Sequence, residues 1–421
     1  MTDVQMKPSG DPLSRTPRGM RLHIGLFGRR NVGKSSVLNA LVNQQASIVS
    51  PFAGTTTDPV GKPMELLPLG PVLFIDTAGV DDVGDLGLMR VQQTERVFDQ
   101  CDMALLVMEA GCWTSYEDSV LEELVKREVP VVLVANKIDL IESSDVSSRV
   151  ADALPAEARD LPLVLASAQN CEGISEVKSA LIANAPEEFI NNPVLVADLV
   201  DPGSVVMLVI PLDKEAPKGR LILPQVQVLR DLLDAGCIPM CVRDTEFEQA
   251  LEKLSEPPAL VIVDSQAFAT VARMVPESIP LTSFSVAFSR FKGDLAAQAL
   301  GTKAIGNLTE SSRVLIAEAC SHHAIGEDIG TVKIPRALRK LAGEGLTIHN
   351  VHGKEFPEDL SEYDLVIHCG GCMLNRRAQL ARIQKCLDAG VPVSNYGLTL
   401  AYCAGVFERA IRAFPNVSGL F

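Results

Sequence analysis

Short apolar runs alternate with helical patterns along the first part of the chain. The run Leu22–Phe27 ends in a glycine-rich turn, and the apolar positions of Val37–Val42 then recur with helical spacing. Four further apolar runs predict strands at Val72–Ile75, Ala104–Met108, Val131–Ala135 and Leu163–Ala166. Helical segments such as Ser119–Arg127 lie between most of them. This alternation predicts an α/β fold with a doubly wound, mostly parallel sheet, and we expect it over residues 21–185.

The rest of the chain has the pattern of two smaller α/β domains. The polar segment Asn184–Pro193 contains two prolines and indicates a linker, and Pro276–Pro280 indicates a second boundary. Strands are predicted at Val205–Ile210, Leu260–Asp264, Val314–Ala317, Leu365–His368 and Val391–Val393, and helices at Gln225–Ala235 and Arg376–Ala389. We therefore expect domains at residues 194–280 and 281–421, and a disordered tail at 1–20.

Composition and charge narrow the class of protein. Hydrophobic residues make up 47% and charged residues 22%, as in ordinary globular proteins. No apolar run approaches the ~18 residues that cross a bilayer, and the N-terminus lacks an apolar signal core, so we expect a cytoplasmic protein with no membrane association. The net charge of −15 argues against nucleic acid as a partner, because such proteins usually present a basic surface.

The turn after the first predicted strand has the pattern of a phosphate-binding loop. Residues 28–35 are G-R-R-N-V-G-K-S, which matches G-x-x-x-x-G-K-[ST] between a strand and a helix. Glycines let backbone amides surround the phosphates, Lys34 places a charge on the β- and γ-phosphates, and the Ser35 hydroxyl is a ligand for Mg²⁺. The residues expected to contact nucleotide here are Gly28, Asn31, Val32, Gly33, Lys34, Ser35 and Ser36.

Two further segments are expected beside the γ-phosphate. Asp76 begins D-T-A-G after the second predicted strand, where its carboxylate can hold Mg²⁺ through water and the Gly79 amide can sense the γ-phosphate. The segment G-T-T-T-D at residues 54–58 is similar to a switch I loop, which supplies a threonine to Mg²⁺. Aligned with the G-T-T-R-D of related GTPases, Thr56 is the best candidate, and Thr55 and Thr57 are alternatives.

Two segments at later strand ends are suited to a guanine base. Asn136, Lys137 and Asp139 belong to N-K-I-D after the fourth predicted strand, and the Asp139 carboxylate can accept hydrogen bonds from guanine N1 and N2, which adenine cannot offer. Ser167 and Ala168 follow the fifth, where a backbone amide can donate to guanine O6. These motifs, in order at the carboxyl ends of strands, closely resemble the GTPase superfamily.

The residue after D-T-A-G distinguishes among GTPases. Val80 stands where Ras-type enzymes place a water-orienting glutamine, so the chain resembles GTPases with a hydrophobic residue there. Within that group, Asn31 resembles the potassium-binding asparagine of the tRNA-modifying GTPase MnmE and its relatives. This resemblance implies that K⁺ assists hydrolysis and that Asp82 orients water, with Asp81 and Asp85, or merely a solvated acidic loop, as alternatives. The residues then expected to carry hydrolysis are Asn31, Lys34 and Asp82.

The last predicted domain contains cysteines and histidines with the spacing of metal ligands. C-S-H-H begins at Cys320 after one predicted strand, and H-C-G-G-C ends another, so the two segments can converge at one sheet edge. Thiolates with nearby imidazoles suit zinc or an iron–sulfur cluster, and a redox dithiol is a third interpretation. The candidate ligands are Cys320, Cys369 and Cys372, with His322 and His368 as additional candidates.

This arrangement, a C-x-H and a later H-C-x-x-C behind a K⁺-type GTPase domain, resembles the iron–iron hydrogenase maturation GTPases, the HydF family. The segment Phe284–Asp294 (FSVAFSRFKGD) is also similar to that family. The resemblance implies GTPase, dimerisation and cluster-binding domains in a homodimer or tetramer. It implies a [4Fe–4S] cluster on Cys320, Cys369 and Cys372 with its fourth iron position open or weakly ligated.

The resemblance also implies a role as a scaffold and carrier. Radical-SAM maturases would build a di-iron precursor on it, and it would deliver that precursor to apo iron–iron hydrogenase. Two alternatives stay open. One is a GTPase of RNA modification or ribosome assembly, and the other is a GTPase whose structural zinc domain serves only for interaction.

Overall fold

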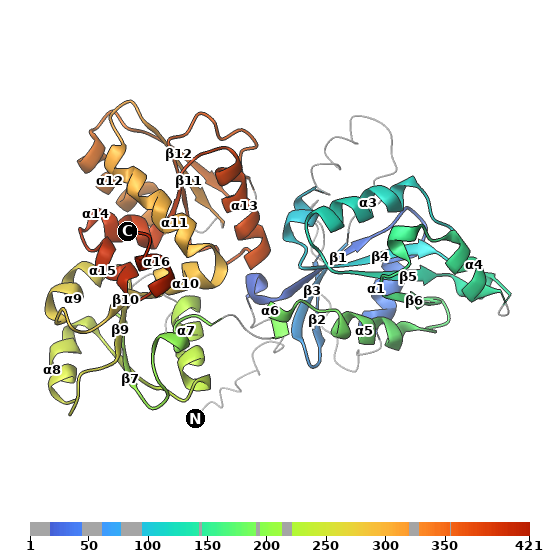
Figure 1. Ribbon diagram of the computed structural model, residues 1–421, viewed down its shortest axis with the longest axis horizontal. Helices are drawn as coiled ribbons and strands as arrows, with labels where there is room; N and C mark the ends of the chain where they lie inside the picture. Colours follow the sequence, from blue (N-terminus) through green and yellow to red (C-terminus); the bar gives the residue numbers. More distant parts are fainter. Residues whose placement is uncertain are drawn as a thin grey trace, which may run out of the picture. The chain divides into compact units, whose positions relative to one another are not determined.

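The described residues of the computed structural model are 17–43, 61–76, 95–142, 145–190, 194–212, 221–319, 328–353 and 355–421 (Figure 1). Contacts divide the chain into two units, Met1–Asn192 and Pro193–Phe421. Residues Arg18–Met20, expected in a disordered tail, form a short 3₁₀ helix. Among the described helices, none is long and apolar enough to cross a membrane.

A six-stranded sheet organises the first unit, and its strand order is β2-β3-β1-β4-β5-β6. The strands are β1 (Leu22–Phe27), β2 (Gly61–Leu66), β3 (Gly70–Asp76), β4 (Met103–Glu109), β5 (Val131–Asn136) and β6 (Leu163–Leu165). Only β2 is antiparallel to its neighbour, and the other described pairings are parallel. The α/β prediction is confirmed, and the edge strand β2 is an addition to it.

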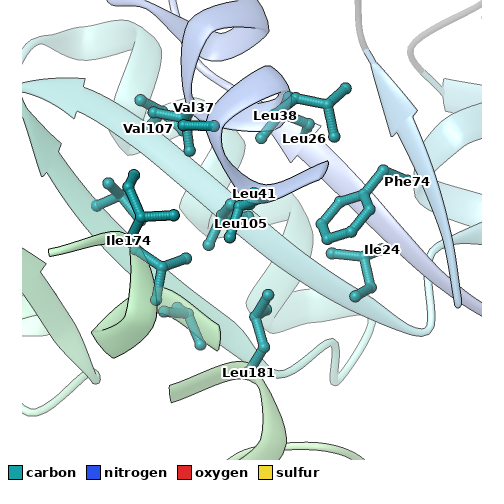
Figure 2. Packing of buried hydrophobic residues seen from close by; sticks show 14 of the residues in the cluster. Ile24, Leu26, Val37, Leu38, Leu41, Phe74, Leu105, Val107, Ile174 and Leu181 are labelled. Atoms are coloured by element: carbon teal, nitrogen blue, oxygen red, sulfur yellow. The ribbon is translucent and has the colours of Figure 1, made fainter. Parts of the chain in front are cut away.

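Helices cover both faces of this sheet. They are α1 (Lys34–Asn43), α3 (Ser115–Lys126), α4 (Val146–Ala153), α5 (Ile174–Ala183) and α6 (Glu187–Ile190). Apolar side chains of α1 and α5, such as Leu41 and Leu181, pack against Ile24 and Leu105 on one face (Figure 2). Residues of α3 and α4 pack on the other. Because both faces are covered, β1, β4 and β5 are almost entirely buried, which explains their continuous apolar runs.

Two parallel four-stranded sheets form the second unit. One has the order β10-β9-β7-β8, from β7 (Val205–Val209), β8 (Ile238–Val242), β9 (Leu260–Val263) and β10 (Leu281–Ser283). The other has the order β12-β11-β13-β14, from β11 (Arg313–Glu318), β12 (Thr347–His352), β13 (Leu365–His368) and β14 (Val393–Asn395). Since β10 pairs with β9, the boundary expected at residue 280 cuts through the first of these sheets and was placed too early.

Helices follow most strands of this unit. They are α7 (Leu223–Asp234), α8 (Phe247–Glu252), α9 (Phe268–Met274), α10 (Phe284–Lys292), α11 (Leu295–Thr302), α12 (Ile334–Ala342), α13 (Arg376–Asp388), α14 (Tyr396–Cys403), α15 (Phe407–Arg412) and α16 (Pro415–Ser418). Side chains of α12 and α14 pack on one face of β11 and β13, and those of α13 pack on the other. Helix α10 begins directly after β10, where the Ser283 hydroxyl accepts the Val286 amide.

Candidate functional site

The phosphate-binding loop lies between β1 and α1, as its motif predicts. Gly28 has φ +144° and Gly33 has φ +96°, in the region that favours glycine. A Cβ on Gly28 would lie 2.2 Å from the Val107 carbonyl oxygen, and one on Gly33 would lie 2.2 Å from Nδ2 of Asn136. Both glycines are therefore required by backbone shape and by close approach. Asn31 has φ +66° and its side chain is exposed.

Hard oxygen donors meet beside this loop. The buried Lys34 ammonium donates to the carbonyl oxygens of Gly28 and Arg29 at 2.5 and 2.9 Å. The Ser35 hydroxyl donates to Oδ2 of Asp76 at 3.3 Å, and Asp76 Oδ1 is buried without a hydrogen-bond partner among the described residues. Burial raises the pKa of Asp76, and Lys34 and Ser35 oppose that rise. An unsatisfied carboxylate oxygen beside a hydroxyl fits the oxygen donor set of Mg²⁺.

The guanine segments form one hydrogen-bonded surface with the loop. Asn136 is buried; its Nδ2 donates to the Val32 carbonyl at 2.8 Å, and its Oδ1 accepts the Ala168 amide at 3.0 Å. Ser167 donates to Oδ1 of the exposed Asp139 at 2.5 Å. Asn136 therefore joins three strand ends, while the Asp139 carboxylate faces solvent where a base can reach it. Nearby, Nζ of Lys137 pairs with Glu109 at 2.8 Å.

Besides the hydrogen bonds of Lys34, an ion pair holds the phosphate-binding loop in place, and this ion pair was not predicted. Arg29 pairs through Nε with Oε1 of Glu117 at 2.9 Å, and the Glu117 side chain is fully buried. The other Glu117 oxygen accepts the amide and hydroxyl of Thr114 at 2.9 and 2.5 Å, which closes a capping box on α3. The T-x-x-E spacing at Thr114 was the available sequence signal for this start of α3 at Ser115.

The parallel strands β11 and β13 place Ala319 and Cys369 at one sheet edge. Ala317 is in register with His368, and the Cys369 amide donates to the Ala317 carbonyl at 3.1 Å. Sγ of Cys369 accepts the amides of Ala319 and Gly371 at 3.1 and 3.4 Å. Ala319 directly precedes Cys320 in the sequence, and Cys320 itself lies outside the described residues.

The donors at this edge fit a thiolate-bound metal. Burial raises the pKa of the Cys369 thiol, and the two amides that donate to it lower that pKa. Amide hydrogen bonds to sulfur are among the features that tune iron–sulfur clusters. Burial lowers the pKa of His368 to about 3, so its imidazole is neutral, and its Nε2 has no partner among the described residues. Cys372 is exposed.

Several predicted site residues lie outside the described ranges. They are Thr56, Gly79, Asp82, Cys320 and His322. Within the residues that the structure does describe, no three His, Cys, Asp or Glu side chains are grouped to hold a metal ion. The roles predicted for these five residues stay predictions.

Models of known families match most of the chain. Residues 23–137 match a 50S ribosome-binding GTPase, residues 195–293 the hydrogen maturase F dimerization domain, and residues 296–413 the hydrogen maturase F tetramerization domain. The last two together cover more than half of the sequence. The chain belongs to the hydrogen maturase F family. Cys369 and Cys372 lie in the part of the chain that matches the tetramerization domain.

Relatives of the GTPase part agree with the sequence prediction. GTPase Der of Wolinella succinogenes is 36% identical over 172 residues, which are 38% of this chain and 35% of that protein. The tRNA modification GTPase MnmE of Moorella thermoacetica is 36% identical over 159 residues, 37% of this chain and 33% of that protein. The chain spans about a third of the length of these curated relatives. This member of the hydrogen maturase F family has a GTPase domain similar to those of MnmE and Der.

A solved structure of an Era variant from Aquifex aeolicus, bound to GDP·AlF₄⁻, is 19% identical. It covers 52% of this chain and 92% of its own, with a TM-score of 0.33.

A cavity of about 60 Å³ is lined in part by Cys369 in this hydrogen maturase F chain. Its walls include Ser289, Lys292, Gln298, Asn395 and Tyr396. Ser289 and the Asn395 amide both donate to Oε1 of Gln298, and the Tyr396 hydroxyl donates to Glu318 at 2.7 Å. These lining residues were missed in the sequence, because they are dispersed among α10, α11, β14 and α14 and form no motif.

Proposed function

We propose that the chain is a GTP-hydrolysing scaffold and carrier for the di-iron subcluster of iron–iron hydrogenase. In this proposal radical-SAM maturases supply the precursor in the cytoplasm, and apo-hydrogenase receives it from a homodimer or tetramer of this chain. The observation that carries the proposal is the hydrogen bond from the Ala319 amide to the Cys369 thiol, one residue before Cys320 in the sequence, in a protein of the hydrogen maturase F family.

Nucleotide chemistry in the proposal follows from the first unit. Lys34 neutralises the β- and γ-phosphates, Ser35 and Asp76 hold Mg²⁺, and Asp139 selects guanine. Mg²⁺ supplies charge stabilisation to the transferring phosphoryl group. The exposed amide of Asn31 is an oxygen ligand for K⁺ at the same loop. In this proposal hydrolysis regulates partner exchange and does not drive the metal chemistry.

The second unit holds the metal in this proposal. Cys320, Cys369 and Cys372 are three thiolates for a [4Fe–4S] cluster, whose fourth iron position stays open or weakly ligated. A site of this kind binds its cargo firmly enough to hold it and weakly enough to release it. The Ala319 and Gly371 amides at Cys369 support the proposal, since they stabilise a thiolate at that position.

Anaerobic purification tests the proposal. We expect a brown protein with about four iron atoms and matching acid-labile sulfide per chain. Cys369→Ser and Cys372→Ser should each lose most of the iron, whereas Cys241→Ser, at an exposed cysteine outside the site, should keep it. A colourless protein that contains zinc and no sulfide would refute the scaffold role and support a structural zinc domain.

A GTPase of RNA modification or ribosome assembly is the second candidate. The match of residues 23–137 to a ribosome-binding GTPase favours it, and the net charge of −15 disfavours it. Binding to ribosomes or tRNA that weakens steeply with salt would support this role, because phosphate contacts release counterions.

A further inference from the structure

Helix α10 ends in a buried lysine beside the cysteine loop, by which we mean residues 369–375. Lys292 is the last residue of α10, and only 2% of it is exposed. Its ammonium donates to the carbonyl oxygens of Gly371 and Leu374 at 3.2 and 2.5 Å. Both acceptors lie in the cysteine loop, on either side of Cys372, so one side chain ties α10 to the loop at two points.

Burying an ammonium group costs free energy, so a role in packing alone does not explain Lys292. Removing a charge from water costs several kcal/mol unless hydrogen bonds replace the lost hydration, and an apolar side chain of similar volume is often at least as stabilising. The two carbonyls and the ring of Phe288, 5.6 Å from Nζ, replace part of that hydration. The placement of Lys292 is therefore best explained by what it does to the cysteine loop.

A second cation ties the same two segments in the opposite direction. Arg376 follows the cysteine loop at the start of α13, and its guanidinium donates to the Phe291 carbonyl at 3.2 Å. The end of α10 and the cysteine loop are thus joined by reciprocal hydrogen bonds, each from a cationic side chain to backbone carbonyls. Backbone carbonyls constrain the loop path directly, which contacts between side chains would not.

We propose that Lys292 is a positioning residue for the metal site. It holds the cysteine loop in the conformation that presents Cys369 and Cys372 to one metal centre, and its positive charge offsets the negative charge of the thiolates there. The second half of this inference rests on the proposed cluster, while the first half concerns the metal-free protein alone.

Alkylation of cysteines in the metal-free full-length protein tests the positioning role. Mass spectrometry after timed iodoacetamide treatment gives the rate at Cys369 relative to the exposed Cys372. We expect Lys292→Met to raise this ratio about tenfold, which corresponds to about 1.4 kcal/mol in closing the loop. The matched control Lys385→Met, at an exposed lysine of α13, should leave it unchanged.

An unchanged ratio in a folded Lys292→Met protein would overturn the positioning role. If Lys292→Met fails to fold, Lys292→Gln removes the charge but keeps a hydrogen-bond donor, and Arg376→Met removes the second tie. Arg376→Met should also raise the Cys369 rate, and no rise in any folded variant would equally overturn the role.

The reduction potential of the iron-loaded protein tests the role of the positive charge of Lys292. Lys292→Gln should move the reduction potential of the cluster to a more negative value, because a positive charge near the metal favours the reduced state. An unchanged potential with full iron content would overturn this half of the inference. A wild-type protein without iron would instead refute the proposed function, and the alkylation result would still decide the role of Lys292.

Discussion

At the scale of single residues, we expect guanine selection to depend on the Asp139 carboxylate. It is exposed to a ligand on one side and held by the Ser167 hydroxyl on the other, at 2.5 Å. Asp139→Asn keeps an acceptor for Ser167 but replaces one oxygen by an NH₂ donor, which opposes the guanine 2-amino group and suits the 2-oxo group of xanthine. We expect affinity for GTP to fall ~10²-fold or more, with a gain for XTP.

Competition binding with fluorescent GTP and XTP measures this change. Glu142→Gln, at an exposed carboxylate of the same loop region, is the matched control and should retain wild-type preference. If Asp139→Asn lowered the affinities for GTP and XTP equally, the carboxylate would support the loop and would not recognise the base.

The predicted dependence of GTP hydrolysis on potassium can be tested at one residue, Asn31, through its side-chain amide. Its backbone is left-handed, so alanine would add strain, whereas glycine removes the amide without that strain. We expect the wild-type protein to hydrolyse GTP about tenfold or more faster in K⁺ than in Na⁺, because a bound cation neutralises charge that develops on the phosphates. Asn31→Gly should lose this difference. Equal rates of the wild type in the two buffers would contradict the prediction.

At the scale of helices and strands, the sequence reveals elements that are buried or carry a motif. The core strands β1, β4 and β5 are continuous apolar runs, and the loop after β1 has an unmistakable spacing. The edge strands β2, β8 and β12 were not predicted, because few of their residues are fully buried and their mixed side chains lack a periodic pattern. Pairing partners distant in sequence, which decide such strands, cannot be inferred from local pattern.

In the candidate site, too, the sequence reveals some residues and not others. Motif residues such as Lys34, Asp76 and Asp139 could be proposed from the sequence, since each belongs to a short motif with fixed spacing. The contacts of Glu117 with Arg29 and of Lys292 with the cysteine loop were missed, because each spans more than seventy residues of sequence. The segment FSVAFSRFKGD was noted only for its resemblance. The structure shows what the charged residues of this segment contact. Arg290 donates to Asp198 and to the Leu195 carbonyl, and Lys292 donates to a carbonyl of the cysteine loop.

The contact of α11 with β14 depends on a glycine. A Cβ on Gly301 would lie 2.2 Å from the carbonyl oxygen and 2.5 Å from the amide nitrogen of Val393. Alanine improves helix propensity by about 1 kcal/mol, but overpacking against backbone costs about 1–3 kcal/mol or more. We expect Gly301→Ala to destabilise the second unit on balance, measured by circular dichroism during urea unfolding.

Two controls accompany this measurement. Leu300→Ala changes a neighbouring side chain that is 50% exposed, so its effect should stay within about 0.5 kcal/mol. The single tryptophan, Trp113, lies in the first unit, and the midpoint of its fluorescence change should not move in Gly301→Ala. A Gly301→Ala protein as stable as wild type would show that β14 can shift to admit a methyl group.

At the scale of the whole molecule, the chain separates nucleotide chemistry from the cysteine edge. The P-loop, its anchors and the guanine segments belong to Met1–Asn192, whereas Cys369 and Cys372 belong to Pro193–Phe421. The two dimerization and tetramerization domain matches also fall in the second unit. If both proposed activities are present, this division predicts that each can be removed without the other.

Lys34→Ala tests that division directly. The Lys34 ammonium donates to Gly28 and Arg29 of its own loop, so its removal should lower the rate of GTP hydrolysis by about 10²-fold or more and leave the second unit folded. Iron and sulfide per chain after anaerobic purification should equal the wild-type values, as should those of Lys126→Ala, a control at an exposed lysine. Loss of iron together with hydrolysis in Lys34→Ala would mean that nucleotide binding is needed to assemble the metal site. The cysteine edge would then depend on the first unit for more than regulation.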